Sequence, residues 1–413
     1  MPKKNAKFYW GASTSSHQVE GNTHNSWSEW EKHTAQKLAQ EFSQKFSYLP
    51  KEIFDRVSPE GTNPNNYISG GAADHYHRYP EDIAIMQELN LNAYRFSIEW
   101  SRIEPEDGQW DMNEVEHYRK KIQALRKAGI EPFVTLWHWT HPVWFEEMGG
   151  WESSRAVEFF TRYVAFITRE LAEELQYVII LNEPKIYSGI SYLFGEWPPQ
   201  KKSFVVAYRV LRKLIRAHNL SYQKIKLKYP NFKIGVAENI AYAEPANSSL
   251  RTRLNVGFQE FVEHMFLRAT SRNMDFVGVN YYFRNRINGF ATQNPNERVS
   301  DLGWDLYPQG LEYVLTQVFK RYQLPVIVTE NGLADATDSQ RQWWREESTQ
   351  AIERAREHGT EIFGYLHWSL LDNFEWDKGF WPRFGLVEVD YTTLERKIRP
   401  SAKWYAKYIN DHS

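Results

Sequence analysis

Eight short apolar runs rich in β-branched residues recur along the chain, separated by longer segments of different character. The runs lack the polar alternation of a half-exposed strand, which is typical of parallel strands buried on both faces. Parallel strands need a crossover of a dozen or more residues between them, and the intervening segments are long enough to supply it. The eight predicted strands are Phe8–Ala12, Ala93–Ile98, Pro132–Leu136, Val178–Leu181, Ile234–Ala237, Phe276–Val279, Val326–Thr329 and Ile362–Leu366.

Amphipathic helices are predicted between these strands. Apolar residues recur at spacings of three and four in the segments before the third, fourth and seventh strands, and Gly129 follows the first of these stripes as a stop signal. Eight strand–helix units of this length favour an α/β fold that closes into a (β/α)8 TIM barrel over a doubly wound sheet. The three stripes are Val115, Tyr118, Ile122 and Leu125; Val157, Phe160, Val164, Ile167, Leu171 and Leu175; and Leu311, Val314, Val318 and Tyr322.

One segment interrupts the alternation. Residues 21–70 are polar and contain two turn-like clusters, at 58–61 and 63–66. Such clusters favour irregular structure, so we expect a long loop after the first strand. No linker-like stretch separates a second domain, and we therefore expect residues 1–413 to form a single (β/α)8 barrel catalytic domain.

Composition narrows the functional classes. The net charge is −2 and the pI is near 6.7, so no strong field attracts nucleic acid or an anionic membrane. The chain has no Cys, which excludes disulfides and thiolate metal sites. Residues 1–7 are not followed by a signal-like apolar stretch, and no run of about 18 apolar residues occurs. We expect a cytoplasmic protein without nucleic-acid or membrane partners. The sequence is compatible with either a monomer or a homo-oligomer.

Tryptophan is abundant, with 17 in the chain. An indole face stacks on the C–H face of a sugar ring, and its N–H donates to hydroxyls. Most of these side chains are equally compatible with core packing. The enrichment therefore favours a carbohydrate ligand without establishing one.

Charged, amide and indole groups gather where the predicted strands end. In a TIM barrel these carboxyl ends form the mouth that carries the active site. Glu183 follows the fourth strand and Glu330 the seventh, so both carboxyls are expected at the mouth. Hydrolysis of a glycosidic bond needs such a pair, one proton donor and one nucleophile or base. The other residues at these ends are Gln18, Glu20, Arg95, Glu99, Trp137, His138, Trp139, Asn182, Asn280, Tyr281, Tyr282, Asn331, His367, Trp368, Asp372, Asn373, Glu375 and Trp376.

Two rival interpretations start from the same residues. His75 and His77 would share one face of an extended segment and, with His138 and His141, could suggest a metal site, but no three-ligand set with helical spacing appears. We expect neither a metal nor a cofactor. The second rival is a sugar-binding protein on a catalytically weak glycosidase barrel, which the presence of both glutamates disfavours.

The motifs in chain order make the chain similar to glycoside hydrolase family 1, the β-glucosidase and β-galactosidase family, over essentially its full length. Each tripeptide is common, but the ordered set is specific to this family. The matching stretches are Phe8-Tyr9-Trp10-Gly11, Gln18-Val19-Glu20-Gly21, Asp74-His75-Tyr76-His77-Arg78-Tyr79, the nonapeptide Tyr94 to Arg102, Asn182-Glu183-Pro184, Thr329-Glu330-Asn331-Gly332 and the nonapeptide Trp368 to Trp376.

The resemblance implies a retaining β-glycosidase acting on terminal β-D-glucosides or β-D-galactosides, with β-fucosidase side activity in reach. It implies that Glu330 is the nucleophile and Glu183 the acid/base, with Arg95 and Asn280 as supporting residues. Arg95 is expected to lower the pKa of Glu330. The residues implied to bind the sugar are Gln18, His138, Trp139, Asn182, Tyr282, Trp368, Glu375 and Trp376.

Two features depart from the family pattern. His141 stands before Pro142 where many members carry Leu or Asn, and we expect it near the mouth. The chain is also shorter than many members, so some loops at the rim are expected to be trimmed. Both features bear on the leaving group and leave the catalytic pair untouched.

Overall fold

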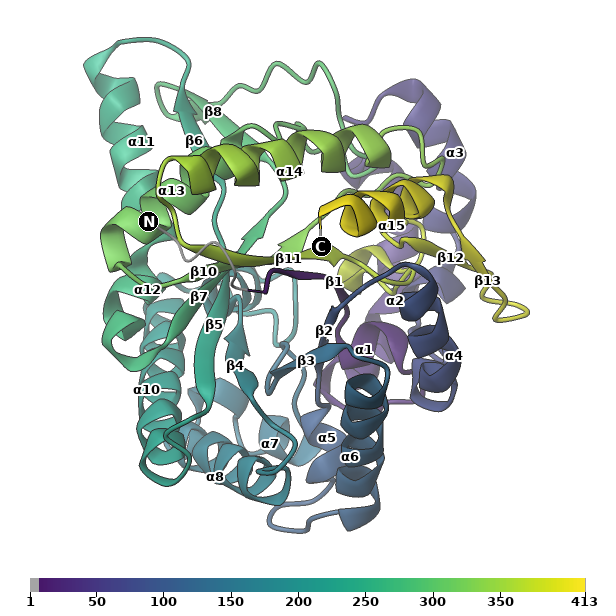
Figure 1. The fold of residues 1–413 in the computed structure, drawn as a ribbon. Helices are drawn as coiled ribbons and strands as arrows, with labels where there is room; N and C mark the ends of the chain where they lie inside the picture. Colours follow the sequence, from purple (N-terminus) through teal and green to yellow (C-terminus); the bar gives the residue numbers. More distant parts are fainter. Residues whose placement is uncertain (1–6, 413) are drawn as a thin grey trace.

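A computed structural model describes residues 7–412, and its centre is a closed barrel of eight parallel strands. The strands follow the chain around the barrel, and β1 closes it by pairing with both β2 and β11 (Figure 1). The predicted TIM barrel is therefore confirmed, and all eight predicted strands are present. They are β1 (Tyr9–Ser13), β2 (Ala93–Ser97), β3 (Glu131–Thr135), β4 (Tyr177–Asn182), β5 (Lys233–Asn239), β7 (Phe276–Tyr281), β10 (Val326–Asn331) and β11 (Ile362–Trp368).

Helices surround the barrel because every second strand residue faces outward, and these apolar side chains must be buried from solvent. The inward-facing residues include Phe133, Ile179 and Ile327, which pack together inside the barrel. Larger apolar side chains of the helices bury the outer face. The main covering helices are α4 (His75–Glu88), α6 (Met112–Lys127), α8 (Ala156–Glu170), α10 (Phe204–Lys228), α12 (Met265–Thr270), α13 (Gly310–Tyr322), α14 (Arg341–Glu357) and α15 (Pro400–His412).

The expectation of a long loop at 21–70 is wrong in its local structure. The segment does follow β1, but it forms α2 (Ser26–Lys45), α3 (Lys51–Gly61) and the short η1 (Pro64–Tyr67). In α2 the buried positions 27, 31, 35, 39 and 42 recur at helical spacing, but only Trp27 and Phe42 carry large apolar side chains. That sparse stripe is easily overlooked among polar residues. Asn25 starts the helix with a capping box shared with Ser28.

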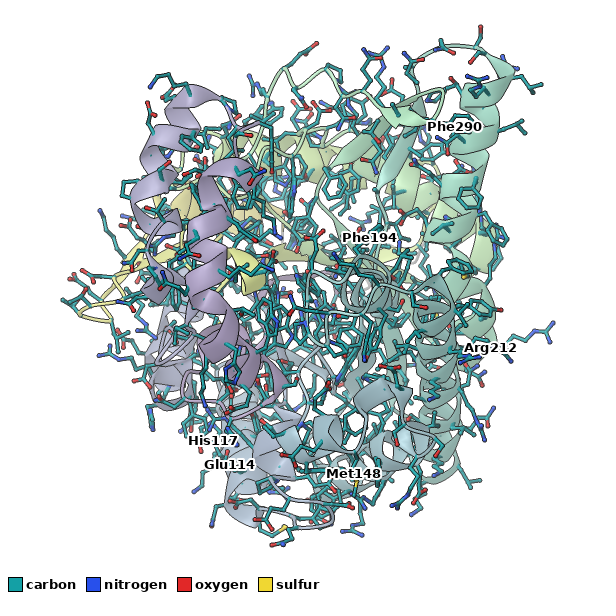
Figure 2. The ribbon with its side chains drawn as sticks, turned by 180° about the vertical axis from the view of Figure 1, so that it is seen from behind. Glu114, His117, Met148, Phe194, Arg212 and Phe290 are labelled. Carbon is teal, nitrogen blue, oxygen red and sulfur yellow. The ribbon has the colours of Figure 1, made fainter. Side chains whose placement is uncertain are left out.

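Smaller elements decorate the mouth and rim. α9 (Pro184–Ser188) and the one-turn η3 (Gly189–Phe194) follow β4 directly, and α11 (Leu250–Glu263) lies beside a small sheet of β6 (Tyr242–Pro245), β8 (Arg284–Asn288) and β9 (Ala291–Thr292). Phe290 sits between β8 and β9 at the outer edge of the molecule, with 81% of its surface exposed (Figure 2). Within residues 7–412, no helix is both long and apolar enough to cross a bilayer.

Candidate active site

Glu330 stands at the carboxyl end of β10 and is held by two donors. Arg95, on β2, donates from one guanidinium nitrogen to Glu330 Oε1 at 2.5 Å, and the Tyr282 hydroxyl donates to Glu330 Oε2 at 2.5 Å. A second guanidinium nitrogen donates to Asn182 Oδ1 at 2.7 Å, and Nε donates to Thr135 at 3.0 Å. Both oxygens of Glu330 are thus oriented by charge-assisted or hydroxyl hydrogen bonds, which fixes the carboxylate in the mouth.

Glu183 follows β4 and adopts an unusual backbone conformation. Its φ is +43° and its ψ +52°, in the left-handed region that a residue with a side chain rarely occupies. Pro184 starts α9 immediately afterwards, and the Glu183 amide donates to the carbonyl of Ala237 on β5 at 2.8 Å. This sharp change from strand to helix turns the carboxyl toward β7, where Asn280 Nδ2 donates to Glu183 Oε1 at 2.6 Å.

Glu183 and Glu330 differ in the groups that oppose the rise in pKa caused by burial. Burial raises the pKa of Glu183 to about 8, and the neighbouring charge of Glu330 adds to that rise. Burial also raises the pKa of Glu330, although the Arg95 guanidinium and the Tyr282 hydroxyl oppose the effect. Arg95 therefore lowers the pKa of Glu330 as expected, but the net shift is upward because the loss of solvation outweighs the ion pair. With more donors, Glu330 ionises before Glu183.

Aromatic side chains line the mouth beside this pair. The ring of His138 lies nearly parallel to the indoles of Trp368 and Trp376, at centroid distances of 6.0 and 6.1 Å. Trp139 packs on Trp376 at 4.7 Å and donates from its indole to the carbonyl of Asn182 at 3.0 Å. The mouth therefore offers flat apolar faces next to hydrogen-bonding groups.

His138 is positioned as a neutral ring. Burial and the charge of Arg95 hold its pKa well below the ordinary value. Its Nε2 lies 3.0 Å from Asn182 Nδ2 and accepts from that amide, which leaves the proton on Nδ1. That Nδ1 has no hydrogen-bond partner among the described residues, so a donor remains available at the mouth.

A second polar cluster surrounds Glu375. Asn373 Nδ2 donates to Glu375 Oε2 at 3.0 Å, and Gln18 Nε2 approaches the same oxygen at 3.3 Å. Gln18 is itself fixed by the carbonyl of Phe374 and the hydroxyl of Ser15. Burial raises the pKa of Glu375 to about 7, against the opposing effect of the Asn373 amide. A buried carboxyl with two side-chain amides around it is suited to recognising hydroxyl groups.

Several polar residues at the strand ends have other partners. Glu20 accepts from Arg102 and Tyr118, and Glu99 accepts from Ser16, Ser101 and Thr140. These contacts join the segments that follow β1, β2 and β3 to one another and to α6. His141, expected near the mouth, is buried and pairs with Glu146 at 2.8 Å, so its ring is occupied by a structural contact.

The four histidines of the metal interpretation do not come together. His75 lies in helix α4, and the extended segment assumed for it is wrong; its Nδ1 pairs with Asp82 at 2.7 Å. His77, two residues further along α4 and therefore on a different side of the helix, pairs with Asp74 at 2.6 Å. Across residues 7–412, no cluster of three or more His, Cys, Asp or Glu has the arrangement of a metal site.

Thr135 and Lys185 were not singled out from the sequence, and Asn373 was placed at a strand end without a role. Thr135 supports Arg95 and Asn373 supports Glu375, as described above. Lys185, two residues after Glu183, is buried, and its charge lowers the pKa of Glu183. Its position directly after Asn182-Glu183-Pro184 was the only signal available, because a lysine in a short helix is ordinarily solvated.

Comparison with known proteins bears on this geometry. Residues 3–272 and 256–413 match the profile of glycosyl hydrolase family 1. β-Glucosidase A of Thermotoga maritima is 30% identical, over 98% of this chain and 97% of that enzyme. β-Galactosidase of Sulfolobus acidocaldarius is 31% identical over 77% of this chain and 80% of that enzyme.

Solved structures agree in fold along nearly the whole chain. A β-glycosidase from Pyrococcus horikoshii superposes with a TM-score of 0.84 at 33% identity, covering 97% of this chain and 93% of that one. The β-glucosidase from Thermotoga maritima in complex with glucoimidazole gives a TM-score of 0.85 at 27% identity, with complete coverage of both chains (100% each). With a family profile that spans the barrel and relatives matched over nearly their full length, the chain belongs to glycosyl hydrolase family 1, the family of β-glucosidases and β-galactosidases.

Proposed function

We propose that the protein is a retaining β-glycosidase, which hydrolyses terminal non-reducing β-D-glucosides and β-D-galactosides, including aryl and alkyl glycosides and short β-linked oligosaccharides. The observation that carries the proposal is the unequal environment of the two carboxyls. Among the described residues, Glu330 receives Arg95 and Tyr282, whereas the one side-chain donor to Glu183 is the neutral amide of Asn280. Such a division separates a carboxylate from a carboxylic acid at one pH.

In the first step, Glu330 attacks the anomeric carbon and forms a covalent glycosyl ester. The glycosidic C–O bond breaks as Glu183 gives its proton to the departing oxygen. A pKa of about 8 for Glu183 keeps that proton in place at neutral pH. Arg95 and Tyr282 hold the Glu330 carboxylate ionised and aimed in one direction.

In the second step, Glu183 removes a proton from water, whose oxygen attacks the anomeric carbon from the side of the departed group. The ester bond to Glu330 breaks, and the sugar leaves with its β configuration. Once Glu330 is esterified it no longer carries a charge, so the charge that raises the pKa of Glu183 is gone. The same carboxyl therefore becomes a base when the mechanism requires one.

The sugar itself is assigned to the aromatic and amide groups of the mouth. We assign the 2-hydroxyl to Asn182, the outer hydroxyls to Gln18, His138, Trp139, Glu375 and Trp376, and the face of the ring to Trp368. The stacked rings around His138 and the amides around Glu375 support this assignment. Glucose and galactose differ only at the 4-hydroxyl, and Glu375 with two oxygens is able to accept from either epimer.

A panel of aryl β-glycosides tests the proposal. We expect turnover of the glucoside and galactoside, with the fucoside as a side activity, and no requirement for an added metal or cofactor. An NMR time course should show the β-anomer of the released sugar first. Initial release of the α-anomer would exclude retention, and sugar binding without any turnover would favour a non-catalytic sugar-binding protein instead.

A further inference from the structure

A buried ion pair lies beside Glu183, at the rim where β4 and β5 end. Lys185, in the first turn of α9, donates from Nζ to the carboxylate of Glu263 at the end of α11. The same ammonium donates to the carbonyl of Asn239, at the end of β5, at 3.0 Å. Lys185 is only 9% exposed. The pair therefore ties the helix that starts at Glu183 to a neighbouring strand and to a rim helix.

The strained turn at Glu183 depends on such an anchor. A left-handed conformation at a residue with a side chain persists only where the surroundings hold it. The Glu183 amide is bonded to β5 through Ala237, and Lys185 is bonded to β5 through Asn239. Both hydrogen bonds are made to β5: Glu183 bonds to Ala237, and Lys185, two residues later, bonds to Asn239, two residues further along the strand. The turn between β4 and α9 is therefore held to β5 at two points.

The charges around Glu183 come from both directions. Glu330, Arg95 and Tyr282 interact with it from the mouth, and Lys185 on α9 and Glu238 on β5 interact with it from the neighbouring elements. The ammonium of Lys185 lowers the pKa of Glu183, in opposition to burial and to Glu330.

The groups that face Lys185 are Glu263, Glu238, Glu183 and His264. His264, between α11 and α12, bonds through Nδ1 to the Tyr322 hydroxyl at 3.0 Å, and burial lowers its pKa to about 3. A neutral His264 adds no charge to the cluster.

Glu238 is the second unusual group in this region. It lies on β5, its side chain is fully buried, and neither carboxyl oxygen has a hydrogen-bond partner among the described residues. Burial raises the pKa of Glu238 well above its ordinary value, which favours the uncharged form of this carboxyl. Glu263, which contacts the ammonium directly, is then the counter-ion of Lys185.

We propose that the Lys185–Glu263 ion pair positions Glu183 and sets its proton affinity, so that one carboxyl can act first as an acid and then as a base. The inference rests on the proposed role of Glu183. Glu183 must hold its proton until the leaving group departs and then accept one from water. Lys185 limits how strongly Glu183 retains its proton, and Glu263 limits how much of the lysine's charge Glu183 experiences. The pair is therefore a positioning and tuning device outside the groups that touch substrate.

Three variants test this role through the pH dependence of kcat/KM for phenyl β-glucoside. Lys185→Gln removes the cation that lowers the pKa of Glu183, so the alkaline limb should move to higher pH. A nearby unpaired charge shifts a pKa by about 1–3 units, but Glu263 offsets part of the charge of Lys185, so we expect a shift of roughly 0.5 unit. Glu263→Gln exposes Glu183 to the full charge of Lys185, so the limb should move to lower pH. Lys185→Arg keeps the positive charge, so its alkaline limb should lie at the same pH as that of the wild type.

A second ion pair provides the matched control. Lys226 on α10 pairs with Asp275 at 2.9 Å, just before β7 and at the opposite end of the barrel. Lys226→Gln removes a comparable cation and should leave the limb unchanged. Far-UV circular dichroism and a thermal melt verify that each variant folds.

The signs of the shifts decide the outcome. Opposite shifts for Lys185→Gln and Glu263→Gln support the inference, and any other combination overturns it. A purely structural role would lower the rate of both variants without moving the limb in opposite directions. The proposed function is tested separately: initial release of the α-anomer, or equal losses of Glu183→Gln on alkyl and dinitrophenyl glycosides, would contradict it whatever the ion pair does.

Discussion

Asn280 donates a 2.6 Å hydrogen bond from its side-chain amide to Oε1 of Glu183, across the mouth from β7 to the end of β4. This amide is the one side-chain donor that Glu183 receives among the described residues. Because the bond favours the ionised carboxyl, it lowers the pKa of Glu183 against the larger effect of burial.

The alkaline limb of activity should therefore report Glu183. Its pKa is raised to about 8, so the protonated form needed for the first step is present at neutral pH and is lost as the pH rises through about 8. Asn280→Ala removes the donor to the ionised form, so the limb should move upward, with a loss of kcat/KM of about tenfold, as expected for a bond to a charged group. A kcat/KM profile from pH 5 to 10 for wild type and variant measures both effects. An alkaline limb that stays in place would separate Asn280 from the proton on Glu183.

The leaving group provides a second prediction. Glu183→Gln keeps the size of the side chain and its contact with Asn280 but removes the proton donor. Alkyl glycosides and disaccharides, whose leaving groups need protonation, should lose about 10²–10⁴-fold in kcat/KM, a range typical of general acid catalysis. Formation of the glycosyl-enzyme from dinitrophenyl glycosides should lose far less. Stopped-flow release of dinitrophenol compares the first step directly, and equal losses for both classes would mean that Glu183 is not the acid.

The third prediction concerns discrimination against phosphate. Glu375 lies among Asn373 and Gln18, and the nearest lysine in its segment, Lys378, is paired with Asp377 at 2.7 Å. Above a pH of about 7, where Glu375 is ionised, a 6-phosphate would meet its carboxylate without a free cation from this segment, and like charges in a partly desolvated pocket repel by several kcal/mol. We expect plain β-glucosides to be cleaved and 6-phospho-β-glucosides to be essentially inert.

Two substitutions separate the charge of Glu375 from its shape. Glu375→Ser should strongly lower kcat/KM for the unphosphorylated glucoside, because the hydroxyls of the sugar lose an acceptor. It should also reduce the discrimination against the 6-phosphorylated glucoside. Glu375→Gln retains the size and an acceptor oxygen but removes the charge, so it should reduce discrimination with a smaller loss on the plain substrate. Comparable kcat/KM values of the wild type for the plain and phosphorylated glucosides would contradict the role of Glu375.

The sequence predicted the barrel well because parallel strands buried on both faces leave continuous apolar runs, such as the run around Val328. It failed for α2, where Trp27 and Phe42 are separated by buried Glu, Thr and Ala, so the apolar stripe is faint. Buried polar residues explain that faintness. Glu31, for example, is buried because His17 and Ser69 bond to it, and neither partner is predictable from local spacing.

The candidate site divides along the same line. Residues in ordered motifs, such as Asn182 and Glu330, were identified, and they lie in contact through Arg95. Lys185 and Glu263 were not, because their pairing joins α9 to α11 across 78 residues and depends on how the rim helices pack. The direction of the pKa shift of Glu330 could not be predicted from the sequence either, because it depends on the balance between burial and the two donors Arg95 and Tyr282.

The identity of the nucleophile is the central claim, and removing it should abolish turnover without unfolding the protein. Glu330→Gln keeps the size of the side chain at the mouth, so the thermal midpoint should change little. The steady-state rate should fall by at least about 10⁴-fold, the scale seen when a covalent catalyst is removed. A circular dichroism melt accompanies the assay, because inactivity with a collapsed midpoint would point to misfolding.

Covalent trapping tests that claim most directly. Incubation with 2,4-dinitrophenyl 2-deoxy-2-fluoro-β-glucoside, followed by proteolysis and tandem mass spectrometry, identifies the carboxyl that carries the sugar. The fluorine slows both steps by destabilising the positive charge that develops at the anomeric carbon, while the good leaving group lets the first step proceed. We predict one fluoroglucosyl group per chain, on Glu330. A label on Glu183, or steady hydrolysis of plain glucosides with no covalent adduct, would contradict the proposed mechanism.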